Sequence, residues 1–218
     1  MRAKPGLLAG AILAAIVLNI VFLSRSLKTA FPNPLKRELA DLDNNTFPET
    51  YVLKNGRLTI RENSKLVWQS ASDWRIDNFI LADSTNDGIV DINLSVWKAG
   101  NFGSSKPFWI KENDQSVKNH FFIFNFKNGV VSPIWQSSNL ESPNQALAVG
   151  DIDDDNRNEL VVIEGSYAKK DVCKENFVAV WRWNDWGFTN QWRSKQGNFC
   201  SLKIEKIEGR SYIMVESF

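Results

Sequence analysis

The stretch from Gln145 to Gly165, QALAVGDIDDDNRNELVVIEG, decides the fold. An Asp-rich turn, residues 151–159, lies between two apolar runs. The second run, residues 160–163, is continuous and apolar, which is typical of a β-strand covered on both faces. The stretch therefore predicts two buried strands joined by an acidic loop.

Alternation elsewhere in the chain also favours strands over helices. In DINLSVW, residues 91–97, the side chains of Ile92, Leu94 and Val96 share one face of an extended chain. Three segments end in a recurring tryptophan at Trp68, Trp135 and Trp192, which are 67 and 57 residues apart. A tryptophan that recurs with the repeat is expected to pack between neighbouring units rather than to bind a ligand.

Each of these three segments has the pattern of a β-hairpin: an apolar run, a turn with Gly56, Gly129 or Gly187, and a second apolar run. A further pair of predicted strands follows each hairpin. Four short strands per unit predict an all-β fold, a propeller-like array of about three four-stranded blades over residues 47–218. Three blades are too few for an ordinary ring, so the two ends complete one blade together, the array stays open, or another subunit completes it.

Two Asp-rich loops occupy the same place in consecutive units and follow the scheme D-x-D-x-D-G-x-x-D. They are DSTNDGIVD, residues 83–91, and DIDDDNRNE, residues 151–159. This pattern resembles the calcium-binding loop of the FG-GAP and VCBS repeats of integrin α chains and bacterial surface proteins. The resemblance implies a β-propeller, calcium held in the loops, and a role in adhesion or binding.

Calcium binds hard oxygen ligands, and carboxylates at alternate positions of a tight turn can point to one centre. The resemblance implies that the ligands are Asp151, Asp153, Asp155 and Glu159 in one loop, and Asp83, Thr85, Asp87 and Asp91 in the other. Neutral Thr85 is a poorer ligand than Asp, so the loop with four carboxylates should bind calcium more tightly. The alternative is that both loops are plain turns whose side chains accept hydrogen bonds from backbone amides.

The amino terminus predicts attachment to a membrane. Residues 1–6 form a cytoplasmic tail, and the uncharged apolar run of residues 7–23 is interpreted as a transmembrane signal anchor, with a cleaved signal or a buried core helix as alternatives. Residues 24–46 form a stalk, either a short helix or a flexible spacer. The chain is thus expected to be a single-pass protein of the cell membrane with its large domain, residues 47–218, outside the cytoplasm.

Composition limits the remaining chemistry. A formal net charge of +1 predicts no nucleic-acid partner. One histidine and two distant cysteines do not supply a zinc site, and His120 has no catalytic partner at a recognisable spacing. Whether Cys173 and Cys200 form a disulfide stays open.

These observations together predict a membrane-anchored, calcium-stabilised binding or adhesion module that is not an enzyme and that binds an unknown protein or glycan. Two alternatives remain. The chain can be a subunit of a larger surface assembly that completes the propeller, which would make it an oligomer. It can also be an enzyme acting on a polysaccharide, with its chemistry in the long loop of residues 98–120 around His120.

Overall fold

The computed structural model describes residues 20–24, 35–102, 108–112, 114–168 and 173–217. In these residues the chain is all-β, as predicted: fifteen strands form four sheets, and there is no helix. The first sheet holds β2 (Lys36–Ala40), β3 (Glu49–Lys54), β4 (Arg57–Glu62) and β5 (Lys65–Gln69). The second sheet holds β6 (Arg75–Ala82), β7 (Asp91–Ala99), β8 (Val117–Lys127) and β9 (Val130–Gln136).

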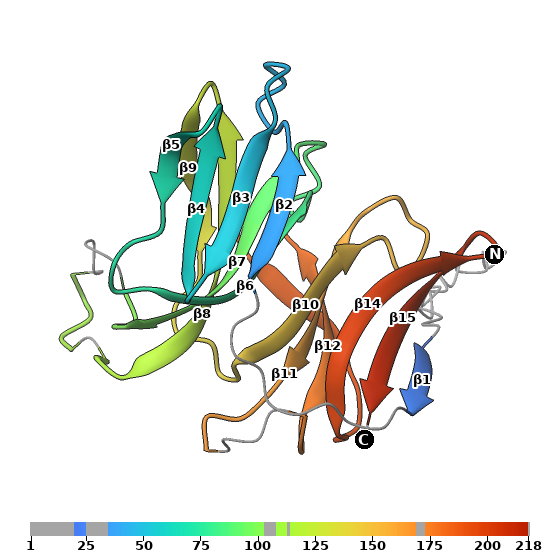
Figure 1. Cartoon of the computed structure of the whole chain (residues 1–218). Coiled ribbons are helices and arrows are strands. Elements are labelled where there is room, and N and C mark those ends of the chain that lie inside the picture. Colours follow the sequence, from blue (N-terminus) through green and yellow to red (C-terminus); the bar gives the residue numbers. More distant parts are fainter. Residues whose placement is uncertain (1–19, 25–34, 103–107, 113, 169–172, 218) are drawn as a thin grey trace, which may run out of the picture.

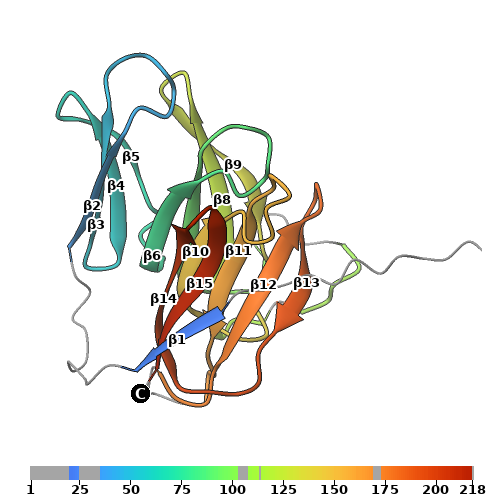
Figure 2. The ribbon, with the colours of Figure 1, turned by 90° about the vertical axis from the view of Figure 1, so that its right-hand side faces the viewer.

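The chain then builds a third and a fourth sheet (Figures 1 and 2). The third sheet holds β10 (Asn144–Gly150), β11 (Glu159–Glu164), β12 (Phe177–Trp183) and β13 (Phe188–Arg193). The fourth sheet holds β14 (Phe199–Ile207), β15 (Arg210–Ser217) and β1 (Ile20–Ser24). Strand β1 pairs in parallel with β15, and all other neighbouring strands pair antiparallel. In the described part of the chain the sheets do not close into a barrel or a propeller ring.

Tight hairpins follow from Asn-Gly pairs. The backbone φ angles are 51° and 74° at Asn55-Gly56, between β3 and β4, and 52° and 73° at Asn128-Gly129, between β8 and β9. Two consecutive positive φ angles define the type I′ turn, whose twist matches that of the strands it joins. Asn and Gly reach this conformation at lower cost than other residues, so these positions fix the two hairpins.

Three hydrophobic cores lie between successive sheets. One joins the first and second sheets, one the second and third, and one the third and fourth. Strand β8 supplies two of them by alternation: Phe122 and Phe124 face the first sheet, whereas Phe121 and Ile123 face the third. Each sheet in the middle of the series is therefore covered on both faces, which explains its continuous apolar strands.

Strand β11 confirms the pattern that decided the fold. Val161 and Ile163 pack toward the fourth sheet, and Leu160 and Val162 pack toward the second, all at most 4% exposed. The recurring tryptophans also behave as predicted: Trp68, Trp135 and Trp192 each pack against a different core.

The prediction that residues 24–46 form a stalk is wrong for the part that contains residues 36–40. Residues 36–40 form β2, which pairs with β3, so the folded region begins before residue 47. The short helix expected for the stalk is absent from residues 35–46, where Leu35 and Leu39 are 64% exposed and Leu42 enters the core. Strand β2 is held by its pairing with β3, and Lys36 Nζ also donates to the carbonyl oxygen of Phe79 in the second sheet.

The predicted membrane segment, residues 7–23, lies largely outside the described residues, the first of which is Ile20. Residues 20–23, the last four of the apolar run, lie in β1. Among the described residues, no helix is long and apolar enough to cross a membrane.

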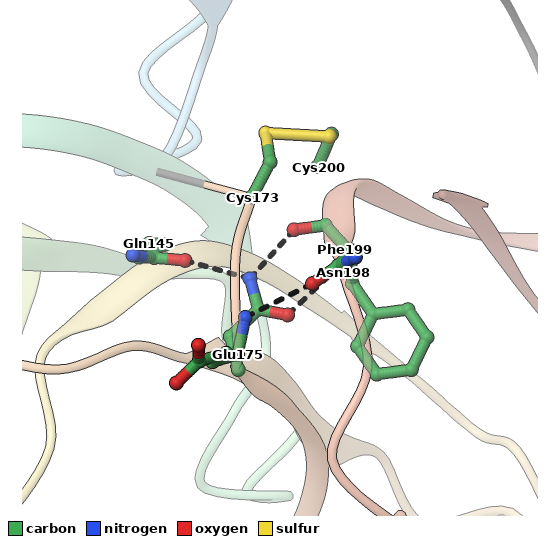
Figure 3. Close-up of a disulfide and its surroundings, with 7 residues drawn as sticks. Gln145, Cys173, Glu175, Asn198, Phe199 and Cys200 are labelled. Atoms are coloured by element: carbon green, nitrogen blue, oxygen red, sulfur yellow. Dashed lines mark hydrogen bonds between the residues drawn. A yellow bond between two sulfur atoms is a disulfide. The ribbon is translucent and has the colours of Figure 1, made fainter. Parts of the chain in front are cut away.

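Cys173 and Cys200 form a disulfide, which answers the question that the sequence left open (Figure 3). It joins the segment before β12 to β14. Next to it, Asn176 binds Phe199 in both directions: Phe199 N donates to Asn176 Oδ1 at 2.8 Å, and Asn176 Nδ2 donates to Phe199 O at 2.7 Å. The disulfide thus fastens a connection that hydrogen bonds already define.

Removing this disulfide should destabilise the protein. For cysteines 27 residues apart, the chain-entropy model gives a loss of about 3 to 4 kcal/mol in the free energy of unfolding. We expect this loss in Cys173→Ser/Cys200→Ser, measured by urea denaturation. A reducing agent should lower the stability of the wild type and leave the double variant unchanged. Equal stability of the two proteins without reductant would contradict a structural role for the bond.

Candidate metal centre

Each of the first three sheets joins its first two strands by a loop of the same length and pattern. The loops span residues 41–49, 83–91 and 151–159. Each begins with an aspartate after the first strand and ends with an acidic residue that is the first residue of the second strand. The loop at 41–49 was missed in the sequence because it was assigned to the stalk; its signal is the acidic residues at positions 1, 3 and 9 of DLDNNTFPE.

The first aspartate of each loop organises the turn by accepting two backbone hydrogen bonds. Its carboxylate oxygens bind the amide groups of the fifth and sixth loop residues at 2.9 to 3.3 Å. These bonds run from Asn45 and Thr46 to Asp41, from Asp87 and Gly88 to Asp83, and from Asp155 and Asn156 to Asp151. An aspartate capping its own loop in this way holds the turn without any metal.

The sixth position of each loop has a positive φ: 75° at Thr46, 83° at Gly88 and 64° at Asn156. Asn156 stands where the 83–91 loop has Gly88, and the turn keeps a positive φ because asparagine tolerates this conformation better than most residues. The last acidic residue then accepts a bond from the amide of the second loop residue. The donors are Leu42, Ser84 and Ile152, and the acceptors are Glu49, Asp91 and Glu159, at 3.0 to 3.3 Å.

In the 41–49 loop, oxygen atoms of Asp41, Asp43 and Glu49 all lie within 4.8 Å of one another. Glu49 is fully buried, and its Oε1 has no hydrogen-bond partner among the residues that the structure describes. Burial raises the pKa of Glu49, opposed by hydrogen bonds to Oε2 from Leu42 N and Tyr51 Oη, each at 3.0 Å. A buried carboxylate oxygen without a donor is costly, and a divalent cation would supply the missing interaction.

In the 151–159 loop, Asp151, Asp153 and Glu159 gather in the same way. Here Arg182 lies among the acids: its Nη2 is 2.9 Å from Asp153 Oδ2, 3.0 Å from Asp155 Oδ2 and 2.7 Å from Glu159 Oε1. Strand register explains this, because Arg182 of β12 pairs directly with Glu159 of β11.

Arg182 therefore supplies positive charge where a cation would bind. Burial raises the pKa of Glu159, and the hydrogen bond from Arg182 opposes this shift. The prediction that the 151–159 loop binds calcium more tightly than the 83–91 loop was based on the number of carboxylates alone and did not consider Arg182. Among the described residues, no lysine or arginine forms an ion pair with Asp41, Asp43 or Glu49, so the 41–49 loop is the more open to a metal.

The 83–91 loop is different, and in the described residues its acids do not form a comparable cluster. Its third residue is Thr85, whose Oγ1 donates to Asp91 Oδ2 at 3.2 Å, as do the amide and hydroxyl groups of Ser84 at 3.0 and 3.2 Å. Burial raises the pKa of Asp91 to about 6 despite these bonds. The structure thus does not bring Asp83 and Asp87 together with Asp91 as three ligands.

The acidic loops also bind one another across sheets. Asn86 Nδ2 donates to the carbonyl oxygen of Asn158 at 3.1 Å, and Asn158 Nδ2 donates to that of Asp83 at 2.7 Å. The 41–49 loop contacts the second sheet, where Gly129 N donates to Asp43 Oδ2 at 3.1 Å. In Figure 1 the loops follow one another along the same side of the fold. They are connections between sheets as well as within them.

His120, the candidate for enzyme chemistry, is fully buried in β8. Its Nδ1 is 3.0 Å from the carbonyl oxygen of Ser137, and its Nε2 has no partner in the described structure. Burial lowers the pKa of His120, and nearby Lys98 lowers it further. His120 is thus a buried residue of the sheet, held by one contact with the backbone.

Comparison with known proteins adds a finding about the fold. No protein-family model and no curated protein matches the sequence. Among solved structures, the chain is similar to the crystal structure of the exotype rhamnogalacturonan lyase YesX, with a TM-score of 0.53 and 12% sequence identity. The match covers 83% of this chain and 38% of the lyase chain, and it shows a shared fold.

This comparison contradicts the prediction that the chain is not an enzyme, because a solved protein with a similar fold is an enzyme. The prediction relied on His120 and on the absence of a paired acid and base in the sequence. A pattern of residues along the chain does not show which side chains meet in space, so it was not sufficient to exclude catalysis.

Replacing Arg182 should increase the dependence of stability on calcium. In Arg182→Met, the acids of the 151–159 loop lose their buried partner, and we expect the calcium-free protein to lose about 3 kcal/mol of stability. The increase in melting temperature caused by calcium should be larger in this variant than in the wild type. Arg193→Met is the control, because it breaks an arginine–glutamate pair of the same sheet outside the loops. Equal calcium shifts in Arg182→Met and the wild type would count against a cation position in this loop.

His120 should make stability depend on pH. Its pKa is lowered in the folded protein from an ordinary value of about 6.5, so the unfolded chain binds more protons as the pH falls below that value. The stability that depends on neutral His120 is thus complete above about pH 6.5 and is lost as the pH falls. Urea denaturation of His120→Gln at several pH values should show a smaller loss on acidification than the wild type. Parallel curves would refute this assignment.

Proposed function

We propose that this chain is a membrane-attached extracytoplasmic module that binds a polysaccharide through a propeller-like series of sheets, with calcium in its acidic loops. The observation that carries the choice of ligand is the fold: most of the chain resembles a protein that acts on rhamnogalacturonan. The loops supply the stability of the module, and the surfaces between the sheets supply the binding sites.

Calcium is supported by the donor set. The clusters at 41–49 and 151–159 consist of carboxylate oxygens, which are the ligands that calcium prefers. Within the described part of the chain, the buried Oε1 of Glu49 lacks a hydrogen-bond partner, as does Oδ1 of Asp153. The resemblance of the loops to FG-GAP and VCBS repeats agrees with this chemistry. Asp83, Thr85, Asp87 and Asp91 remain weaker candidates because, among the described residues, Asp83 and Asp87 do not gather with Asp91 into a cluster of ligand oxygens.

An extracytoplasmic location is supported by two separate features. The disulfide between Cys173 and Cys200 is of the kind that persists in oxidising compartments. The uncharged apolar run that begins at Leu7 follows a short basic segment, as in proteins that are targeted to membranes.

Cleavage of the polysaccharide is the second candidate function, and the enzyme among the solved structures favours it. Completion of the array by another subunit is a further possibility supported by the open series of sheets. Both candidates are compatible with polysaccharide binding. Formation of a cleaved product would identify the enzyme, and a molecular mass larger than that of one chain in solution would identify the assembly.

The proposal is tested with the full-length chain in detergent by electrophoresis through gels that contain rhamnogalacturonan. We expect the polysaccharide to retard the protein when calcium is present, and a chelator to weaken this retardation because the loops lose their cation. Polyacrylate, a polyanion without sugar rings, is the control for charge. Formation of an unsaturated sugar product, followed by its ultraviolet absorbance, would show lyase activity. Migration unaffected by rhamnogalacturonan would contradict the proposed function.

A further inference from the structure

A hollow of about 440 Å³ lies between the second and third sheets, and none of its described lining residues belongs to an acidic loop. Its size is in the range of small-molecule binding sites and is too large for a packing gap in a close-packed core. Its lining combines large aromatic side chains with polar ones. The aromatic and charged lining residues include Trp135, Trp181, Phe188, Glu164, Arg193 and Glu141.

The aromatic side of the hollow is rigid. Trp135 and Phe188 have ring centroids 5.6 Å apart, and Phe188 also contacts Phe121 at 5.6 Å. Trp135, Trp181 and Phe188 are half-buried, so each packs against the core and still presents part of its ring. A flat apolar surface fixed in this way suits the apolar face of a sugar ring.

The polar side is built around Glu164, which is 7% exposed. Trp181 Nε1 donates to its Oε1 at 3.1 Å, and Arg193 Nη2 lies 2.9 Å from its Oε2. Arg193 is in turn placed over the ring of Phe177, 4.1 Å from its centroid. A carboxylate has further lone pairs beyond these two bonds, so Glu164 can still accept hydrogen bonds from hydroxyl groups.

The charges of the hollow select the kind of sugar. Its ionisable lining residues are Glu141, Glu164 and Arg193, which give one positive and two negative charges and therefore a net charge of −1. Arg193 is already paired with Glu164. An acidic sugar would meet net repulsion, whereas the hydroxyl groups of a neutral sugar can donate to the carboxylates.

We propose that this hollow is a binding site for a neutral pyranose unit of the polysaccharide, stacked on Trp181 and hydrogen-bonded to Glu164. The site rests on the proposed function and deepens it by naming the sugar class. A neighbouring hollow of about 300 Å³ shares Trp135 and Phe188 and extends to Trp186, which is 83% exposed. It has room for the next unit of the same glycan chain.

The test uses the full-length chain and two probes, methyl α-L-rhamnopyranoside and D-galacturonic acid, with binding followed by saturation-transfer NMR and tryptophan fluorescence. The neutral glycoside should bind at least about tenfold more tightly than the uronic acid because of the charge difference. Trp181→Ala should lower the affinity for the neutral probe by about tenfold because the stacking surface is lost. Trp109→Ala, which changes an exposed tryptophan outside the hollow, should have no effect.

Glu164→Gln keeps the shape of the side chain and removes one negative charge. It should narrow the preference for the neutral probe over the uronic acid, a change in selectivity that a general loss of folding does not produce. Near-ultraviolet circular dichroism establishes that each variant is folded.

Unchanged affinity for the neutral probe in folded Trp181→Ala, or equal binding of the two probes to the wild type, would overturn this site. If rhamnogalacturonan still retards Trp181→Ala as it does the wild type, the hollow is rejected while the proposed function stands. If rhamnogalacturonan retards neither protein, the proposed function fails as well.

Discussion

The bond between the first aspartate of each acidic loop and the backbone amides four and five residues later is the interaction on which the rest depends. In the 151–159 loop, Asp151 holds Asp155 N and Asn156 N, and the chain turns through a left-handed residue. This turn sets where the second strand begins. It thereby places the final acidic residue, Glu159, inside the loop and in register with Gly150 of the first strand.

The same geometry in three sheets has a consequence for packing. The 83–91 and 151–159 loops lead to β7 and β11, strands that are covered on both faces, and the 41–49 loop leads to β3, which packs on one core. Contacts such as Asn86 with Asn158 join one loop to the next. The loops thus link neighbouring sheets, and the spaces between the sheets include the aromatic hollow proposed to bind sugar.

The sequence was sufficient where the signal is local. Alternation in residues 91–97, the apolar run at 160–163 and the acidic spacing of the 83–91 and 151–159 loops predicted strands and turns that the structure contains. Strand β2 was missed because residues 24–46 were assigned to a stalk, and the contacts that hold this strand, its pairing with β3 and the bond from Lys36 to the second sheet, are not visible in the spacing of its residues.

The site was predictable only in part for the same reason. Arg182 of β12 contacts Glu159 of the neighbouring strand β11, and the spacing of these two residues along the chain does not predict this contact. The role of Thr85 as a hydrogen-bond donor to Asp91 also depends on the folded loop. Glu49 carries a local signal, its spacing from Asp41 and Asp43, but it was hidden by the assignment of residues 24–46 to a stalk.

The central claim, that the folded loops hold a cation, is tested most directly by counting the calcium ions bound to the full-length chain with native mass spectrometry. The account predicts bound calcium in the wild type and one ion fewer in Asp41→Asn/Asp43→Asn, with Asp185→Asn, an exposed turn residue elsewhere, as the unaffected control. A folded wild type that binds no calcium, or a double variant that binds as many ions as the wild type, would contradict it.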